Sequence, residues 1–216
     1  MNELFIKLKE LQPEADYQTL MSVMQNYSHP RRKLKDLQKK ELLTRVKKGF
    51  YVFNSEFFGK NYSKEITSNL LYGPSYISLE YALSHYGLIP ERVENLTAIT
   101  CQKNKKFETP IGVFTYRHLN LDLYQIGVIR AKNSEDGRYY LIASAEKALL
   151  DYYYFNFSKN DNPTKAELII SLEEDLRCSL KSVIKLISKK RIKELKSYYI
   201  HREWCSLLID LLEERL

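Results

Sequence analysis

The sequence lacks any long run of apolar residues. No hydrophobic stretch approaches the roughly 20 residues that a helix needs to cross a bilayer. The first residues, MNELFIKLKELQPE, also lack the apolar core and the small-residue cleavage site of a signal peptide. These absences predict a cytoplasmic protein with no membrane partner.

Cysteine is scarce as well. Cys101, Cys178 and Cys205 are odd in number, lie far apart and form no C-x-x-C pair. The sequence therefore suggests neither a disulfide framework nor a zinc site. We expect all three to be reduced residues of the core or its boundary, and we expect no metal or other cofactor.

Positive charge is abundant in one short segment. The 216-residue chain has a formal net charge of +7. Between Pro30 and Gly49 lie nine lysines and arginines against Asp36 and Glu41, and nine minus two is again +7. The rest of the chain is balanced. Such a concentrated excess favours an anionic partner for this segment.

The pattern around this segment predicts three helices and a hairpin. The helices are expected over residues 2–11, over residues 17–25 after an Asp16 cap, and from a Ser28 cap to about residue 42. The β-prone segments 43–46 and 50–53 follow, and Gly49 allows the positive φ of a tight turn between them. This order predicts a winged helix-turn-helix domain over residues 1–60, in which the third helix enters the major groove of DNA.

A helical wheel places the basic residues of the third helix on one face, with Leu34 and Leu37 roughly opposite. The alternative for such a charged face is a solvated surface. Under the DNA hypothesis, residues near the helix start reach base edges and the others contact phosphate. The expected base-reading side chains are Arg31, Arg32 and Lys35. The complete expected DNA-binding set is Ser28, Arg31, Arg32, Lys33, Lys35, Lys39, Lys40, Arg45, Lys47 and Lys48.

Residues 61–216 are expected to form a second domain, which makes the chain α+β. A helix is expected over residues 61–71 and another after a Ser78 cap. Alternating patterns predict an antiparallel sheet or meander over about residues 96–143, including a strand from 121 to 130. Ser144 is expected to cap the helix AEKALLDYYYF, and a helical tail follows from about Pro163.

Three segments give this chain a resemblance to a known family. They are LLTRVKKGFYVF, PSYISLEYALSHYGLIPERVENLTAITCQKNKKFETPIGVFTYRHL and YYLIASAEKALLDYYYF, which span most of residues 42–155. In these segments and in their order, the chain resembles the AbiEi family of antitoxins. Members of that family are the transcriptional regulators of type IV toxin-antitoxin operons, which act in abortive infection and phage defence. The tail after Pro163 matches no motif of the family.

The resemblance implies a winged-helix repressor that binds inverted repeats in its own promoter, with two copies on the DNA. It also implies that the C-terminal domain counteracts a nucleotidyltransferase toxin of the AbiEii type, directly or indirectly. By motif, Arg45, Lys47 and Lys48 correspond to the basic wing. No catalytic residue comes with the resemblance, so we expect a protein that is not an enzyme.

Two other functions stay open at this point. One is a stand-alone winged-helix transcriptional regulator whose second domain senses a ligand or dimerises. The other is a metal-dependent nuclease, for which Glu108, Asp122 and Glu146-Lys147 are the candidate residues. Glu80 and His85 share the polar side of one predicted helix, where exposed polar residues are more common than a catalytic pair.

Overall fold

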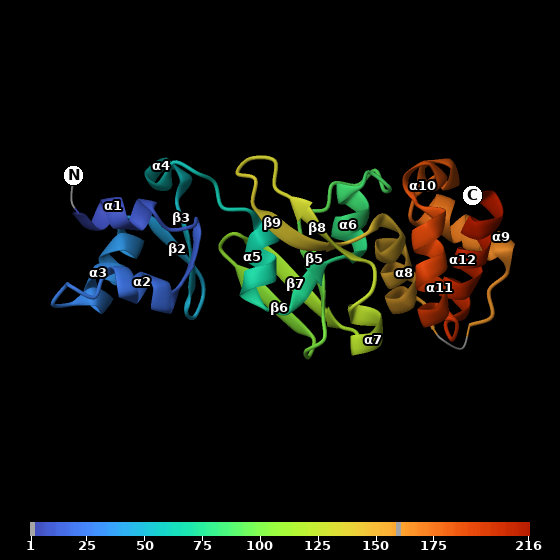
Figure 1. The fold of residues 1–216 in the computed structure, drawn as a ribbon, viewed down its shortest axis with the longest axis horizontal. Helices are drawn as coiled ribbons and strands as arrows, with labels where there is room; N and C mark the ends of the chain where they lie inside the picture. Colours follow the sequence, from blue (N-terminus) through green and yellow to red (C-terminus); the bar gives the residue numbers. More distant parts are fainter. Residues whose placement is uncertain (1–2, 159–160) are drawn as a thin grey trace.

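The computed structural model describes residues 3–158 and 161–216 of an α+β protein. Asn2, where the first helix is predicted to begin, lies outside the described residues. Three parts follow one another along the long axis (Figure 1): an N-terminal module, a central sheet and a group of C-terminal helices. Within the described ranges the strands form a three-stranded sheet and a six-stranded sheet.

The N-terminal module alternates short helices and strands around its own core. Asp16 caps the second helix as predicted, because its Oδ1 accepts the backbone N–H of Thr19 at 2.7 Å. The strand before that helix was not predicted. The elements are α1 (Glu3–Lys9), β1 (Glu14–Asp16), α2 (Tyr17–Val23), α3 (Pro30–Lys39), β2 (Leu43–Lys47), β3 (Phe50–Phe53) and α4 (Ser55–Phe58).

The predicted limits of the third helix are wrong at both ends. His29, not Ser28, is the N-cap residue of α3, and no described side chain caps this helix. The helix ends at Lys39 rather than near residue 42, because Glu41 adopts a φ of 55° that a helix cannot continue. Pro30 does lie in the first turn as expected.

The β2–β3 hairpin confirms the predicted turn. Leu43 pairs with Phe53 and Arg45 with Tyr51, and Gly49 has a φ of 84°. The register shifts between Arg45 and Lys47, which marks a bulge. Strand β1 pairs with the other side of β3, so the sheet order is β1-β3-β2.

Strand β3 is buried on both faces of this small sheet. Tyr51 and Phe53 belong to the core of the N-terminal module, whereas Phe50 and Val52 belong to the core of the rest of the chain. The alternation follows from the two-residue period of a strand. The sheet therefore joins two cores, with the helices of its own module on one side and the second part of the protein on the other.

The central sheet corrects the predicted antiparallel meander. Strand β4 pairs in parallel with β9, and β5 pairs in parallel with β7, because β7 lies between β5 and β6. The strand predicted from residue 121 is instead a short helix followed by a later strand. The elements are α5 (Lys64–Leu71), β4 (Ser75–Ile77), α6 (Leu79–His85), β5 (Leu96–Thr100), β6 (Lys105–Thr109), β7 (Gly112–His118), α7 (Leu121–Tyr124), β8 (Val128–Lys132) and β9 (Tyr139–Ala143). The strand order is β6-β7-β5-β4-β9-β8.

Helices complete the chain after β9, as predicted. Ser144 caps α8, since its Oγ accepts the backbone N–H of Lys147 at 3.3 Å. The elements are α8 (Ala145–Asn156), α9 (Lys165–Ile170), the π-helical turn η1 (Ser171–Asp175), α10 (Leu180–Leu186), α11 (Lys189–Tyr199) and α12 (Glu203–Arg215). Among the residues that the structure describes, no helix combines the length and apolar character needed to span a membrane.

Candidate nucleic-acid interface

Helix α3 is amphipathic in the way its sequence predicts. Leu34 and Leu37 are 4% and 2% exposed and pack in the core of the N-terminal module. The opposite side is exposed and basic, and the helix lies at the end of the molecule remote from the C-terminal helices (Figure 1). The exposed basic side chains, which we call the α3 basic face, are Arg31, Arg32, Lys35 and Lys39.

The α3 basic face keeps its positive charges unpaired within the described part of the chain. Across residues 3–158 and 161–216, none of these four side chains has a carboxylate within 4 Å in an ion pair. The Arg31 Nε donates to the hydroxyl of Tyr17 at 3.2 Å, which fixes the direction of this guanidinium. The face is therefore free to attract an anion.

The start of α3 opens onto a cavity of about 610 Å³. Among the described residues, no side chain makes a capping hydrogen bond to the first turn of α3. The partial positive charge of the helix N-terminus therefore faces the cavity. Ser28, expected to contact DNA or cap the helix, has an exposed side chain at the cavity wall. The lining residues are Tyr17, Met21, Ser28, His29, Pro30, Arg31 and Arg32.

Two further predicted residues flank the α3 basic face. Lys33 is half-buried, and its Nζ lies 5.9 Å from the centre of the Tyr27 ring. Lys40 is exposed and follows the last residue of the helix as its C-cap. A partly buried lysine has less reach than an exposed one, so Lys40 is better placed than Lys33 for a long-range contact with phosphate.

The hairpin does not present all of its predicted cations to solvent. Arg45 and Lys48 are exposed, with the Arg45 Nε 3.4 Å from the carbonyl oxygen of Lys47. The ammonium of Lys47, however, donates to the carbonyl of Leu71 and lies 5.3 Å from the centre of the Phe107 ring. Burial lowers the pKa of Lys47. Lys47 thus ties the hairpin to the central sheet, and the bulge beside it explains why simple alternation did not reveal this.

The acidic residues considered for a nuclease have different surroundings, and Asp122 is exposed in α7. Glu108 is exposed and pairs with Lys106 at 2.7 Å, whereas Glu146 is 1% exposed inside the protein. In the described part of the chain, no group of three or more His, Cys, Asp or Glu side chains could hold a metal ion. The His85 ring packs edge-on against Tyr86 and Tyr140 rather than pairing with Glu80.

A buried polar cluster that the sequence analysis missed lies between α8, α11 and the start of α6. Lys147 and Asp151 form an ion pair of 2.5 Å, and both side chains are fully buried. The hydroxyls of Tyr76, Ser78 and Tyr199 donate to Asp151 at 3.0, 2.8 and 2.9 Å. Ser78 is the N-cap residue of α6, as predicted, but its hydroxyl donates to Asp151 and makes no capping hydrogen bond.

Burial sets the protonation of this cluster. Burial lowers the pKa of Lys147, and the Asp151 carboxylate opposes that shift. Burial and the Asp151 carboxylate raise the pKa values of Tyr76 and Tyr199 well above the ordinary value for tyrosine. The cluster has no outward-facing group, so its contacts are those of a structural bridge. Its sequence signal is the four-residue spacing of Lys147 and Asp151, which places both side chains on one face of α8.

No model of a known protein family matches this chain, and no curated protein matches it. The surface properties of the described residues are therefore the basis for a functional proposal. They single out the α3 basic face, which carries four unpaired cations on one side of one helix.

Proposed function

We propose that this protein is a winged-helix transcriptional repressor that binds double-stranded promoter DNA, and that it is an antitoxin of the AbiEi type. The observation that carries the proposal is the α3 basic face, exposed on a helix whose other side is buried in a small α/β module. The element order α1-β1-α2-α3-β2-β3 supports a winged-helix arrangement. An exposed, unpaired and basic third helix is what such a module needs in order to enter the major groove.

Roles within the interface follow from position and chemistry. Arg31, Arg32 and Lys35 lie toward the start of α3, and an arginine there can pair with a guanine edge through two hydrogen bonds. Lys39 and Lys40 at the helix end contact phosphate, as do Arg45 and Lys48 on the hairpin. Lys47 is omitted from this set because its ammonium donates to the carbonyl of Leu71 at the end of α5 and lies over the Phe107 ring of β6. Two copies would occupy an inverted repeat, one on each half-site.

The antitoxin part of the proposal concerns the central sheet and the C-terminal helices. It rests on the sequence resemblance alone, and it assigns to this region the neutralisation of an AbiEii-type nucleotidyltransferase toxin in the cytoplasm. The test is co-expression with the product of the adjacent open reading frame. Rescue of growth supports the antitoxin role, whereas growth arrest at full expression of this protein contradicts it and leaves the regulator proposal standing.

DNA binding is tested by a mobility-shift assay with the region upstream of the gene. We expect a retarded complex on this duplex at protein concentrations that leave an unrelated duplex of equal length unbound. Incubation of the same duplex with Mg²⁺ should leave it intact. Equal retention of both duplexes would contradict a sequence-specific repressor, and cleavage would favour the nuclease.

Salt should weaken the complex steeply. If six or more phosphates are neutralised, the affinity for the duplex is expected to fall by about 10³-fold or more between 50 and 200 mM salt, because binding releases condensed counterions. Fluorescence anisotropy at several salt concentrations measures the slope of log affinity against log salt. An affinity that is nearly independent of salt would exclude the α3 basic face as the DNA contact.

A further inference from the structure

The junction between the N-terminal module and the central sheet contains a buried carboxylate. Glu14 lies opposite Val52 in the β1–β3 pairing, on the face of the small sheet that is turned toward the rest of the chain. Its side chain is fully buried. A charged carboxylate without solvent is strongly unfavourable unless a cation and hydrogen-bond donors replace the water.

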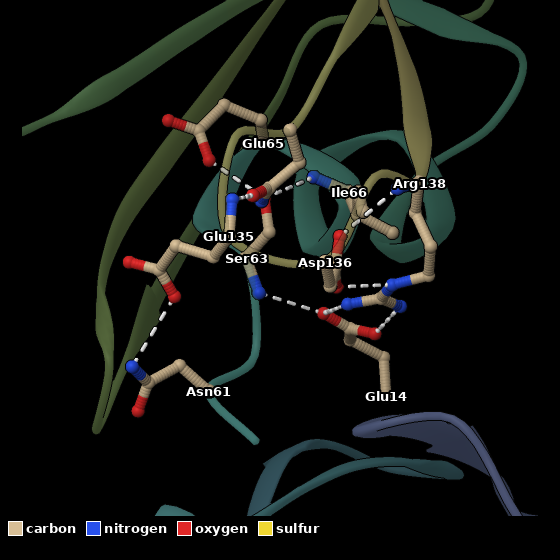
Figure 2. Close-up of polar contacts among 9 residues, drawn as sticks. Glu14, Asn61, Ser63, Glu65, Ile66, Glu135, Asp136 and Arg138 are labelled. Atoms are coloured by element: carbon tan, nitrogen blue, oxygen red, sulfur yellow. Dashed lines mark hydrogen bonds and ion pairs between the residues drawn. The ribbon is translucent and has the colours of Figure 1, made fainter.

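Arg138 supplies that cation from the turn between β8 and β9 (Figure 2). Both of its terminal nitrogens donate to Glu14, Nη1 to Oε2 and Nη2 to Oε1, the latter at 3.2 Å. The backbone N–H of Ser63 donates to the same Oε1 at 2.8 Å. One carboxylate on β1 therefore binds two segments of the second part of the protein, the turn and the connection before α5.

The guanidinium of Arg138 is held in place by its own turn. Its Nε donates to Asp136 Oδ2 at 2.5 Å, and its backbone N–H donates to Asp136 Oδ1 at 3.0 Å. Burial disfavours the charge, but Glu14 and Asp136 outweigh it and raise the pKa of Arg138. Its Nε faces Asp136 and its two terminal nitrogens face Glu14, so the fork has one orientation.

Away from this contact, the described residues of the junction are held by the hydrogen bond from the Lys47 ammonium to the carbonyl of Leu71 and by apolar packing. The connection between α4 and α5 contains Gly59 with a φ of 81°, and Asn61 donates to Glu135 across the same gap at 3.2 Å. The gap beside these residues is a cavity of about 690 Å³, so packing there is incomplete. The apolar contacts of Phe50 and Val52 are non-directional. The Glu14–Arg138 pair supplies a directional contact.

We propose that Arg138 is a positioning residue for DNA binding, which fixes the direction of α3 relative to the central sheet by clamping Glu14. The proposal rests on the DNA-binding function proposed above. Arg138 does not touch the DNA in this account. It determines where the central sheet and the C-terminal helices lie along a duplex once α3 occupies the major groove, so a change in the β8–β9 turn reaches the interface through this pair.

The protein can be tested with spin labels on cysteines introduced at the exposed Gln25 and Lys185, with Cys101 replaced by serine. We expect Arg138→Gln to broaden the distribution of distances between the labels at least about twofold. Arg138→Lys, which keeps the charge but lacks the planar fork, should give a distribution of intermediate width. Arg215→Gln is the matched control, because Arg215 is an exposed arginine of α12, in the C-terminal group of helices (Figure 1), and it should leave the distribution unchanged.

The same variants are then measured on a duplex with one half-site and a fluorophore at its end, with the acceptor at position 185. For Arg138→Gln we expect a broadened transfer efficiency while the affinity for the half-site changes less than about twofold. An unchanged distribution in a folded Arg138→Gln protein would overturn the positioning role. Failure of the wild-type protein to bind DNA would instead overturn the proposed function. The two failures can be told apart, because the spin-label distances test the Glu14–Arg138 contact in the free protein, without DNA.

Discussion

Replacing Arg31, Arg32, Lys35 and Lys39 together by alanine is expected to lower the affinity for promoter DNA by about 10³-fold or more, since contacts of this kind contribute about 1–3 kcal/mol each. The four side chains are exposed, whereas the buried side of α3 is formed by Leu34 and Leu37. The fold should therefore survive the change. Anisotropy titrations at a single salt concentration, with circular dichroism of the variant, measure both effects.

The control for this variant removes the same number of charges elsewhere. Lys181, Lys185, Lys189 and Lys193 are exposed lysines of α10 and α11, far from α3 along the molecule (Figure 1). Their joint replacement by alanine lowers the net charge by the same amount as the α3 variant. The comparison therefore separates the effect of where the charges lie from the effect of total charge. We expect at most a small loss of affinity. If both quadruple variants bind equally weakly, net charge rather than the α3 basic face drives binding.

Replacing Asp151 by alanine is expected to lower the free energy of unfolding by about 3–5 kcal/mol, the usual consequence of leaving one member of a buried ion pair without its partner. The change strands the ammonium of Lys147 and removes the shared acceptor of three buried hydroxyls. Each stranded group adds a desolvation cost. Urea unfolding followed by circular dichroism measures the difference.

Asp122 gives the matched control for Asp151. It is exposed in the short helix α7, so Asp122→Ala should change the free energy of unfolding by less than about 0.5 kcal/mol. The double variant Lys147→Met with Asp151→Asn should recover part of the loss, because no charge is then left buried alone. A small effect of Asp151→Ala would mean that water or a rearranged Lys147 replaces the carboxylate.

The Asp151 cluster also separates the two halves of the functional proposal. It lies among α8, α11 and the start of α6, whereas the α3 basic face is at the other end of the molecule (Figure 1). A variant that destabilises the C-terminal helices without unfolding α3 should weaken any toxin neutralisation before it weakens DNA binding. This expectation applies where partial unfolding is populated, since stability is not uniform across a structure.

The sequence by itself determined the local features of this protein. Leu34 and Leu37 lie on one face of α3 and four basic residues lie on the other, because a helix places residues three and four apart on one face. This pattern determined which side of the helix is buried. Gly49 decided the hairpin turn, and Asp16 and Ser144 decided two helix starts. These outcomes depend on neighbours within a few residues, so pattern and side-chain chemistry were enough.

Only the tertiary structure decided how distant segments meet. Strand β7 pairs in parallel with β5 because it lies between β5 and β6, and no local pattern carries that information. The ammonium of Lys47 donates to the carbonyl of Leu71, and Arg138 donates to Glu14 across a separation of 124 residues. Each of these contacts replaces water around a buried polar group. The partner that does so is set by three-dimensional packing, which is why the sequence predicted the basic face but not the junction that orients it.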